Sequence, residues 1–545
     1  MANVLREALE KGEFLYTAEL VMGRDHQVPD AETFVKEAGQ TPDGIRIISA
    51  TDLPGGSPAL PPEAFVSFVL QCGLTPIAHL TGKDGNRSWL EARLHTFARM
   101  GVENILALTG DAHKPAFSGK PKPVFDLDAV LILQLVEAVR QGIEYPMGSR
   151  TVRTSPFNFF SGAAVSPFKV REPDQMMQLY KLELKIAAGA RYIITQLGYD
   201  LRKLYELKQY MAREGMGHIP VLANVYVPTA TVAKMMKEGE VAGCVIADSF
   251  IQKLEGEKKP QRLERAALMV AAVRELGFAG AHIGGFGLAH KDFMTIIQRS
   301  KEVGSEWRKH MDDLVFSYPG TFYLLPEGSD GLSKGDGAYN APSIKPRSPV
   351  RLWLSEMVSS RMIEEDSFGG RFLASRIKSK NGAKEGEPVK HTGFWYAMVG
   401  LPSSLYRRRM LGCLECGDCV QDHLNYSGCS MRYCYKETRN GPCGGSRPDG
   451  TCEVNPEQQC IWNTVYDNTL AAKKDPRQEF ARTLLPPRNW DLNRTSALAN
   501  RLAGLDNTHH RQKLEVVQPS SNVQVAQPSK EKQAWVPPGE LGKGE

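Results

Sequence analysis

Short apolar runs alternate with longer amphipathic stretches along the first half of the chain. The runs are nearly continuous in apolarity and rich in β-branched and aromatic residues, which is typical of parallel strands covered on both faces. They lie at residues 14–20, 44–52, 75–81, 104–111, 158–165, 192–198, 219–227 and 279–287. The pattern therefore predicts eight strands, most of them with a polar residue at or just past the carboxyl end.

Between these runs, apolar residues recur every three to four positions, as on the buried face of a helix. Residues 88–101 and 261–277 are examples, and both end in Gly, a common helix terminator. Strand followed by helix, eight times, predicts an α/β protein with a (β/α)8 barrel, the TIM-barrel fold. Because that fold carries its active site at the carboxyl ends of the strands, the candidate residues are Glu19, Thr51, Asp52, His79, Thr81, Asp111, Gln196 and Asn224.

At 545 residues the chain is too long for a barrel alone. We expect the barrel at 1–305, a connecting and docking region at 306–404, a cysteine-rich domain at 405–475 and a C-terminal extension at 476–545, disordered after about 511. Within the connecting region we expect an exposed loop at 326–349, a helix at 351–365, a Lys-rich insertion at 376–391 and an apolar docking segment at 392–410.

Charge and hydropathy narrow the classes of partner. The net charge of +5 is mild and unclustered, so nothing favours nucleic acid or an acidic membrane surface. The first residues contain no apolar signal-peptide core, and no run of 18 apolar residues could cross a bilayer. We expect a cytoplasmic protein, and a homo-oligomer.

Cysteine usage indicates a metal site in the second half of the chain. Cys72 and Cys244 lie in apolar barrel segments and are expected to be small buried side chains. In a reducing cytoplasm, the density of the remaining cysteines favours metal ligation over disulfides. Two [4Fe–4S] clusters would use all eight thiolates, whereas structural zinc needs four per ion, and spacing leaves both alternatives open. The predicted ligands are Cys413, Cys416, Cys419, Cys429, Cys434, Cys443, Cys452 and Cys460.

The carboxylates at the strand ends suggest acid chemistry. Glu19 lies one residue from the end of its strand, where we expect partial desolvation to raise its pKa so that it delivers a proton near neutrality. Asp111 follows Gly110, which would let a ligand approach the backbone, although an N-cap role is equally open. Gln196 and Asn224 lie in apolar strands and are expected to contact a ligand or a neighbouring loop.

The barrel motifs resemble those of the methylenetetrahydrofolate reductase family. The segments YTAEL (16–20), AHLT (78–81), ALTGD (107–111) and AAGARYIITQ (187–196) follow the family's order. The resemblance implies flavin-dependent reduction of 5,10-methylenetetrahydrofolate to 5-methyltetrahydrofolate, or the reverse, with FAD or FMN as the cofactor. Glu19 would be the acid that protonates N10, Asp111 would lie near flavin and pterin, and Gln196 would contact folate. The flavin-lining positions would be Thr51, His79, Thr109, Gly110, Asp111 and Lys185, with Thr109 standing where many members have Arg.

The cysteine-rich part resembles the C-terminal domain that is fused to, or accompanies, a subset of these reductases. CLECGDC (413–419) and NGPCGGSRPDGTCEVNPEQQCIW (440–462) carry the resemblance. One hypothesis is that this domain relays electrons to the flavin from ferredoxin or NAD(P)H. The alternative is a zinc-stabilised module that docks a C1-pathway partner such as a methyltransferase.

Overall fold

The computed structural model describes residues 3–24, 27–335, 337–340, 371–372, 401–425 and 427–514. The helix expected at 351–365, the Lys-rich insertion at 376–391, the first part of the docking segment (392–400) and nearly all of the tail after 511 lie outside the described residues, as does the end of the loop at 326–349. Among the described helices, none is both long and apolar enough to span a membrane.

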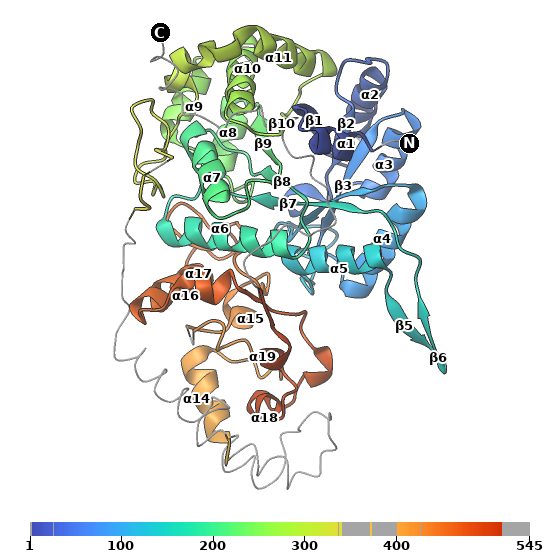
Figure 1. Cartoon of the computed structure of the whole chain (residues 1–545), viewed down its shortest axis with the longest axis vertical. Coiled ribbons are helices and arrows are strands. Elements are labelled where there is room, and N and C mark those ends of the chain that lie inside the picture. Colours follow the sequence, from blue (N-terminus) through green and yellow to red (C-terminus); the bar gives the residue numbers. More distant parts are fainter. Residues whose placement is uncertain are drawn as a thin grey trace.

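The first half of the chain forms a closed barrel of eight parallel strands (Figure 1). Around the barrel the order is β1, β10, β9, β8, β7, β4, β3 and β2. The strands are β1 (Leu15–Leu20), β2 (Ile47–Ala50), β3 (Thr75–Thr81), β4 (Asn104–Leu108), β7 (Phe160–Val165), β8 (Tyr192–Thr195), β9 (Val221–Tyr226) and β10 (Gly280–Gly284). Each falls within a run that the sequence predicted, so the (β/α)8 fold class is confirmed.

Helices cover the outside of the barrel. They are α2 (Val28–Gly39), α3 (Pro62–Gln71), α4 (Arg87–Met100), α5 (Ala129–Gln141), α6 (Glu172–Ala187), α7 (Leu201–Arg213), α8 (Ala230–Lys237), α9 (Asp248–Glu255), α10 (Lys259–Glu275) and α11 (His290–Val303), with 3-10 turns at Pro54–Gly56 and Gly304–Asp313. Helix α4 ends as the sequence predicted, because Gly101 adopts the left-handed conformation with φ 79°. An additional hairpin, β5 (Glu144–Met147) with β6 (Arg150–Arg153), projects from the barrel (Figure 1), and the sequence analysis did not predict it.

Inward-facing positions change from apolar to polar toward the carboxyl ends of the strands. Leu15 and Ile77 belong to an apolar interior layer, which Leu5 of α1 (Val4–Lys11) closes from the amino-terminal end. Two and four residues further along β1 the inward positions are Thr17 and Glu19. The apolar layer makes the barrel a packed core, and the polar layer above it forms the floor of a site.

The cysteine-rich region packs on α6. Its elements are α14 (Leu401–Leu411), α15 (Ser430–Tyr433), α16 (Ile461–Ala471), α17 (Pro476–Phe480), a turn at Trp490–Leu492, α18 (Ala497–Leu502), α19 (Asn507–His510) and a short pairing of β11 (Thr483–Leu484) with β12 (Gln512–Lys513). Helices α16 and α17 contact α6 (Figure 1). Tyr466 donates a 2.8 Å hydrogen bond to Glu172, and Arg477 donates one of the same length to Glu183.

The sequence analysis assigned the docking surface to residues 392–410. In the described part of that segment, residues 401–410, α14 carries Arg407, which lies 2.8 Å from the sulfur of Cys419. Helix α16, which follows the last cysteine, contacts the barrel through α6, as α17 does.

Candidate active site

A cavity of about 780 Å³ opens at the carboxyl ends of the barrel strands. Its volume is within the range of small-molecule sites. The residues that the sequence nominated all line it: Glu19, Thr51, Asp52, His79, Thr81, Thr109, Gly110, Asp111, Lys185, Gln196 and Asn224. Barrel closure therefore brings together residues from six strands or the loops that follow them, and Lys185 from α6.

Glu19 lies beside a histidine that the sequence analysis did not single out. Nε2 of His282 on β10 is 3.1 Å from Oε2 of Glu19, and Nδ1 of the same ring is 2.5 Å from the Thr17 hydroxyl. Burial raises the pKa of Glu19, but the hydrogen bond and charge of His282 oppose this effect, and the pKa lies below its ordinary value. The expectation of a raised pKa was wrong, because desolvation alone was considered.

The second histidine at the floor of the cavity is held in its neutral form. Nε2 of His79 lies 2.7 Å from the Ser49 hydroxyl. Burial lowers the pKa of His79 to about 4, although the charge of Glu19 acts in the opposite direction. A neutral ring can both donate and accept a hydrogen bond, which suits contact with a heteroaromatic ligand.

Asp52 has a structural role in this arrangement. Its Oδ2 accepts hydrogen bonds from the backbone N–H and the hydroxyl of Thr81, at 2.9 and 2.7 Å, and from Arg93 at 3.0 Å. These bonds tie the end of β2 to β3 and α4. Asp52 and Thr81 border the cavity, but their polar atoms are largely used on each other.

Asp111 is the second carboxylate of the cavity. Its Oδ2 accepts a 2.9 Å hydrogen bond from the backbone N–H of Gly55. Burial raises the pKa of Asp111, and the positive charge of Lys436 opposes that shift. Gly110, just before it, has φ +91°, which favours glycine, and a Cβ there would lie 3.1 Å from the Lys83 side chain.

Two more of the nominated residues are held by the backbone. Nζ of Lys185 donates a 2.5 Å hydrogen bond to the carbonyl of Ala164, and burial lowers the pKa of this lysine to about 7. Gln196 accepts a hydrogen bond from Leu197 N–H at 2.9 Å, which leaves its amide NH2 directed toward the loop at Gly243. Because its pKa is about 7, Lys185 can change its charge near neutrality.

Five cavity-lining residues carry a buried polar atom without a hydrogen-bond partner among the described residues. They are Ser166 (Oγ), Gln178 (Nε2), Asn224 (Oδ1), His290 (Nε2) and Glu453 (Oε2). Buried polar atoms in folded proteins are nearly always satisfied, so such a set in a cavity indicates a ligand with several polar edges.

The cysteine-rich region forms part of the cavity wall. Lys436, Cys443, Gly444, Gly445 and Glu453 line the cavity together with the barrel residues. Cations of the barrel hold the loop at 440–449 by its backbone carbonyls. Lys181 donates to Gly441 at 3.1 Å, Lys169 to Ser446 at 2.8 Å and Arg171 to Asp449 at 3.1 Å.

The eight clustered cysteines separate into two neighbourhoods. Burial, helped by the neighbouring thiols of Cys416, Cys419 and Cys413, raises the pKa of Cys429 to about 12. All four of these thiols act on the buried cation Arg407. The first group is therefore Cys413, Cys416, Cys419 and Cys429.

The second group is Cys443 with its three neighbours, Cys434, Cys452 and Cys460. Burial raises the pKa of Cys443, Lys436 opposes the shift, and Glu453 and Cys434 add to it. Burial also raises the pKa values of Cys452 and Cys460, and both of these thiols are close enough to Cys443 to be affected by its charge. As the side chains stand, no three His, Cys, Asp or Glu residues within the described ranges could hold a metal ion.

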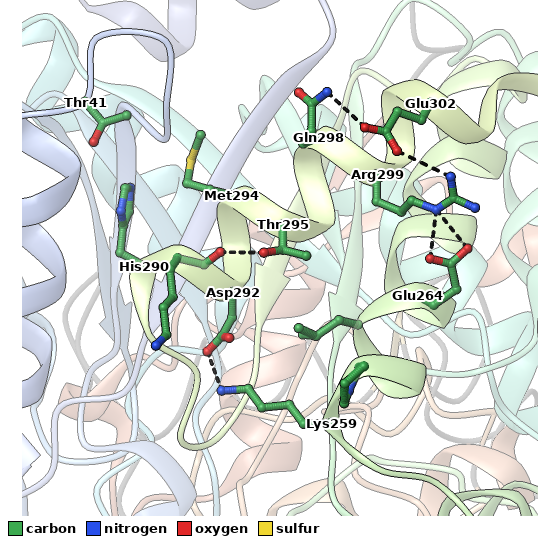
Figure 2. A pocket seen from close by; sticks show the side chains of 13 residues that line it. Thr41, Lys259, Glu264, His290, Asp292, Met294, Thr295, Gln298, Arg299 and Glu302 are labelled. Carbon is green, nitrogen blue, oxygen red and sulfur yellow. Dashed lines mark hydrogen bonds and ion pairs between the residues drawn. The ribbon is translucent and has the colours of Figure 1, made fainter.

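A second hollow lies outside the barrel between α10 and α11 (Figure 2). Its charged side chains mostly neutralise one another, because Lys259 pairs with Asp292, and Arg299 pairs with both Glu264 and Glu302. Such pairing is typical of a solvated helix surface. The hollow gives no indication of chemistry comparable to that of the barrel cavity.

The functional candidates that sequence reasoning missed are His282, Lys436 and Glu453. His282 is an isolated histidine in an apolar strand, and its register opposite Thr17 is visible only in the folded barrel. Lys436 and Glu453 lie between the cysteines, where the sequence gives no indication that they face a barrel more than 300 residues away.

Comparison with known proteins agrees with this architecture. The family model described as methylenetetrahydrofolate reductase matches residues 4–286, and the model described as methylene-tetrahydrofolate reductase C terminal matches residues 402–491. The protein "Methylenetetrahydrofolate reductase 2" of Saccharomyces cerevisiae is 24% identical over 198 residues, which are 35% of this chain and 30% of that protein. The protein of the same name from Schizosaccharomyces pombe is 23% identical over 185 residues, 33% of this chain and 27% of the relative.

Among solved structures, a Clostridium thermocellum protein described as binding two copies of 5-methyl-5,6,7,8-tetrahydrofolic acid has a TM-score of 0.39 at 12% identity. That alignment covers 55% of this chain and 99% of the other. A 2,3-dimethylmalate lyase structure has a TM-score of 0.33 at 14% identity and covers 56% of this chain and 86% of the other. The chain spans less than a third of the length of the two yeast relatives.

Fold and cavity together define a TIM-barrel protein with a large cavity at the carboxyl ends of its strands. The methylenetetrahydrofolate reductase family model covers the whole barrel, from residue 4 to residue 286. The chain belongs to the methylenetetrahydrofolate reductase family, and it carries that family's C-terminal domain as well.

Proposed function

We propose that this protein reduces 5,10-methylenetetrahydrofolate to 5-methyltetrahydrofolate, or catalyses the reverse reaction, in the cavity at the barrel mouth. The observation that carries the proposal is that Glu19, Asp111 and Gln196, which stand in the family's motifs, line one cavity. Membership of the family supports the same reaction. We expect the division given in the sequence analysis, with the barrel at 1–305 and the cysteine-rich domain at 405–475 of the same chain.

The cavity fits a flavin, either FAD or FMN. The unpartnered atoms of Ser166, Gln178 and Asn224 offer both donors and acceptors to a polar ring system. The residues that would hold the flavin are Thr51, His79, Thr109, Gly110, Asp111 and Lys185. When bound and reduced, a flavin supplies a hydride to the methylene carbon of the substrate.

Glu19 would donate the proton that opens the folate ring at N10. Its side chain retains 22% exposure at the cavity floor, so a substrate placed over it excludes the remaining water and favours the protonated form. Nε2 of His282, 3.1 Å from the carboxylate, would hold it in place until then. Asp111 would stabilise the cationic iminium, and Gln196 would hold the folate through its amide.

The donor chemistry of both cysteine groups fits metal-bound thiolates. The backbone N–H groups of Glu415 and Gly445 point at the sulfurs of Cys413 and Cys443, at 3.3 and 3.4 Å. The buried Arg407 supplies positive charge to the first group. Such donors stabilise the anionic sulfurs of either a [4Fe–4S] cluster or a zinc site.

The position of the second group favours an electron relay. Cys443 lines the same cavity as Glu19 and Asp111, so a [4Fe–4S] cluster held by this group would supply electron transfer directly at the catalytic cavity. Ferredoxin or NAD(P)H would be the donor. With zinc in its place, the domain would instead dock a C1-pathway protein such as a methyltransferase.

The test is a spectrum of the full-length protein purified without oxygen, taken before and after dithionite, with iron and zinc analysis of the same sample. Flavin bands with a bleachable iron–sulfur shoulder and turnover of methylenetetrahydrofolate would support the reductase with its relay. Zinc without iron would favour the docking alternative. Protein that binds neither flavin nor folate would contradict the proposed reaction.

A further inference from the structure

Lys436 extends from the cysteine-rich region into the mouth of the barrel. Its side chain is only 4% exposed, and its Nζ donates a 2.7 Å hydrogen bond to the carbonyl of Gly110. The same ammonium group forms an ion pair with Glu453, which also lines the cavity. A lysine buried this deeply requires an acidic partner, and Glu453 provides it.

Lys436 holds the backbone of a turn in the candidate active site. Gly110 adopts φ +91°, packed against the Lys83 side chain, and Asp111 follows it. Gly55 N–H holds the Asp111 carboxylate from the opposite side at 2.9 Å. The Gly110–Asp111 turn is thus fixed by two barrel loops and by one residue of the cysteine-rich region.

We propose that Lys436, oriented by Glu453, is a positioning residue of the active site, fixing the Gly110–Asp111 turn and placing a positive charge beside the Asp111 carboxylate. The barrel site is then incomplete without the cysteine-rich region. This inference rests on the proposed reduction of folate in the same cavity. It assigns the cysteine-rich region a part in catalysis that does not depend on which metal the region holds.

Other buried lysines at the domain boundary provide the contrast. Lys169 is 1% exposed and donates to the Ser446 carbonyl at 2.8 Å, so it joins the two regions as tightly as Lys436 does. It is absent from the cavity lining in the described part of the chain. If Lys436 only joined the two regions, its replacement should affect the reaction rate as little as replacement of Lys169. If Lys436 positions the active site, its replacement should lower the rate further.

The experiment compares Lys436→Met, Lys436→Arg and Lys169→Met in the full-length protein. The single-turnover rate of methylenetetrahydrofolate reduction by pre-reduced protein is measured together with the thermal midpoint and the metal content. We expect Lys436→Met to lose about tenfold or more in rate, with a thermal midpoint and metal content matching those of Lys169→Met. The Arg variant should recover most of the rate, because it keeps the charge and a donor.

Amide hydrogen exchange gives a readout that is independent of the reaction. The peptide spanning residues 108–116 should exchange faster in Lys436→Met than in Lys169→Met. Equal exchange in the two variants, or equal losses of rate, would overturn the positioning role. If the unmodified protein fails to turn over folate, the proposed function fails, whereas faster exchange at 108–116 would still support the positioning of this turn by Lys436.

Discussion

Nε2 of His282 lies 3.1 Å from Oε2 of Glu19, across the pairing of β10 with β1. The opposite ring nitrogen, Nδ1, is 2.5 Å from the Thr17 hydroxyl, so both ring nitrogens are used. If the Thr17 O–H donates to Nδ1, the proton of the neutral ring is on Nε2 and faces the carboxylate. This geometry fixes the direction of the Glu19 side chain and lowers its pKa.

Glu19→Gln should separate the two halves of the proposed reaction. The amide keeps the size of the side chain but cannot donate a proton to N10. We expect the variant to bind flavin and to be reduced as fast as the unmodified protein, while folate turnover falls by about 100-fold or more. Rapid-reaction spectroscopy of each half-reaction measures this. Glu13→Gln, at an exposed position, is the control, and equal losses in both halves would refute the role of Glu19 as the acid.

His282→Gln should shift the pH dependence of folate reduction. The imidazole of His282 lowers the pKa of Glu19 first through its hydrogen bond and then through its charge, so replacing the ring should raise that pKa. A step that needs protonated Glu19 is lost as pH rises through its pKa. The alkaline fall in kcat/KM should therefore occur at a higher pH in the variant than in the unmodified protein. Identical profiles would mean that Glu19 is not the titrating acid.

Cysteine variants in the two groups should remove different metal sites. Cys429→Ser should eliminate the metal held by the first group, and Cys460→Ser that held by the second, each leaving about half of the total. Metal analysis of the anaerobically purified variants measures this, with Cys244→Ser in the barrel as the control. Complete loss of metal in both variants would show that the eight thiolates serve a single site.

Tyr466→Phe should weaken the packing of the cysteine-rich region on the barrel. The change removes the 2.8 Å hydrogen bond to Glu172, whose carboxylate is buried at 4% exposure. Loss of a hydrogen bond to a buried charge costs about 1–3 kcal/mol. We expect a lower midpoint of denaturant unfolding, whereas Tyr145→Phe on the exposed hairpin should leave it unchanged. If the two variants have equal midpoints, this contact contributes nothing measurable.

Local patterns in the sequence predicted the barrel and most of its site. Strand and helix periodicities depend on neighbours a few residues apart, and a closed parallel barrel places every strand's carboxyl end on one face. Glu19, His79 and Asp111 were therefore identifiable from their places in the strands. The exposed β5–β6 hairpin was not predicted, because its short strands bury almost nothing and leave no hydrophobic alternation.

By itself, the sequence determined the (β/α)8 fold, the residues at the strand ends and the existence of a cysteine-rich region. The tertiary structure alone decided how those parts affect one another. Glu19 and His282 are 263 residues apart, and Gly110 and Lys436 are 326 apart. The spacing of cysteines likewise could not tell which thiols are neighbours. Charges act through distance in space, so the pKa of Glu19, the two cysteine groups and the entry of Lys436 into the barrel follow only from the folded chain.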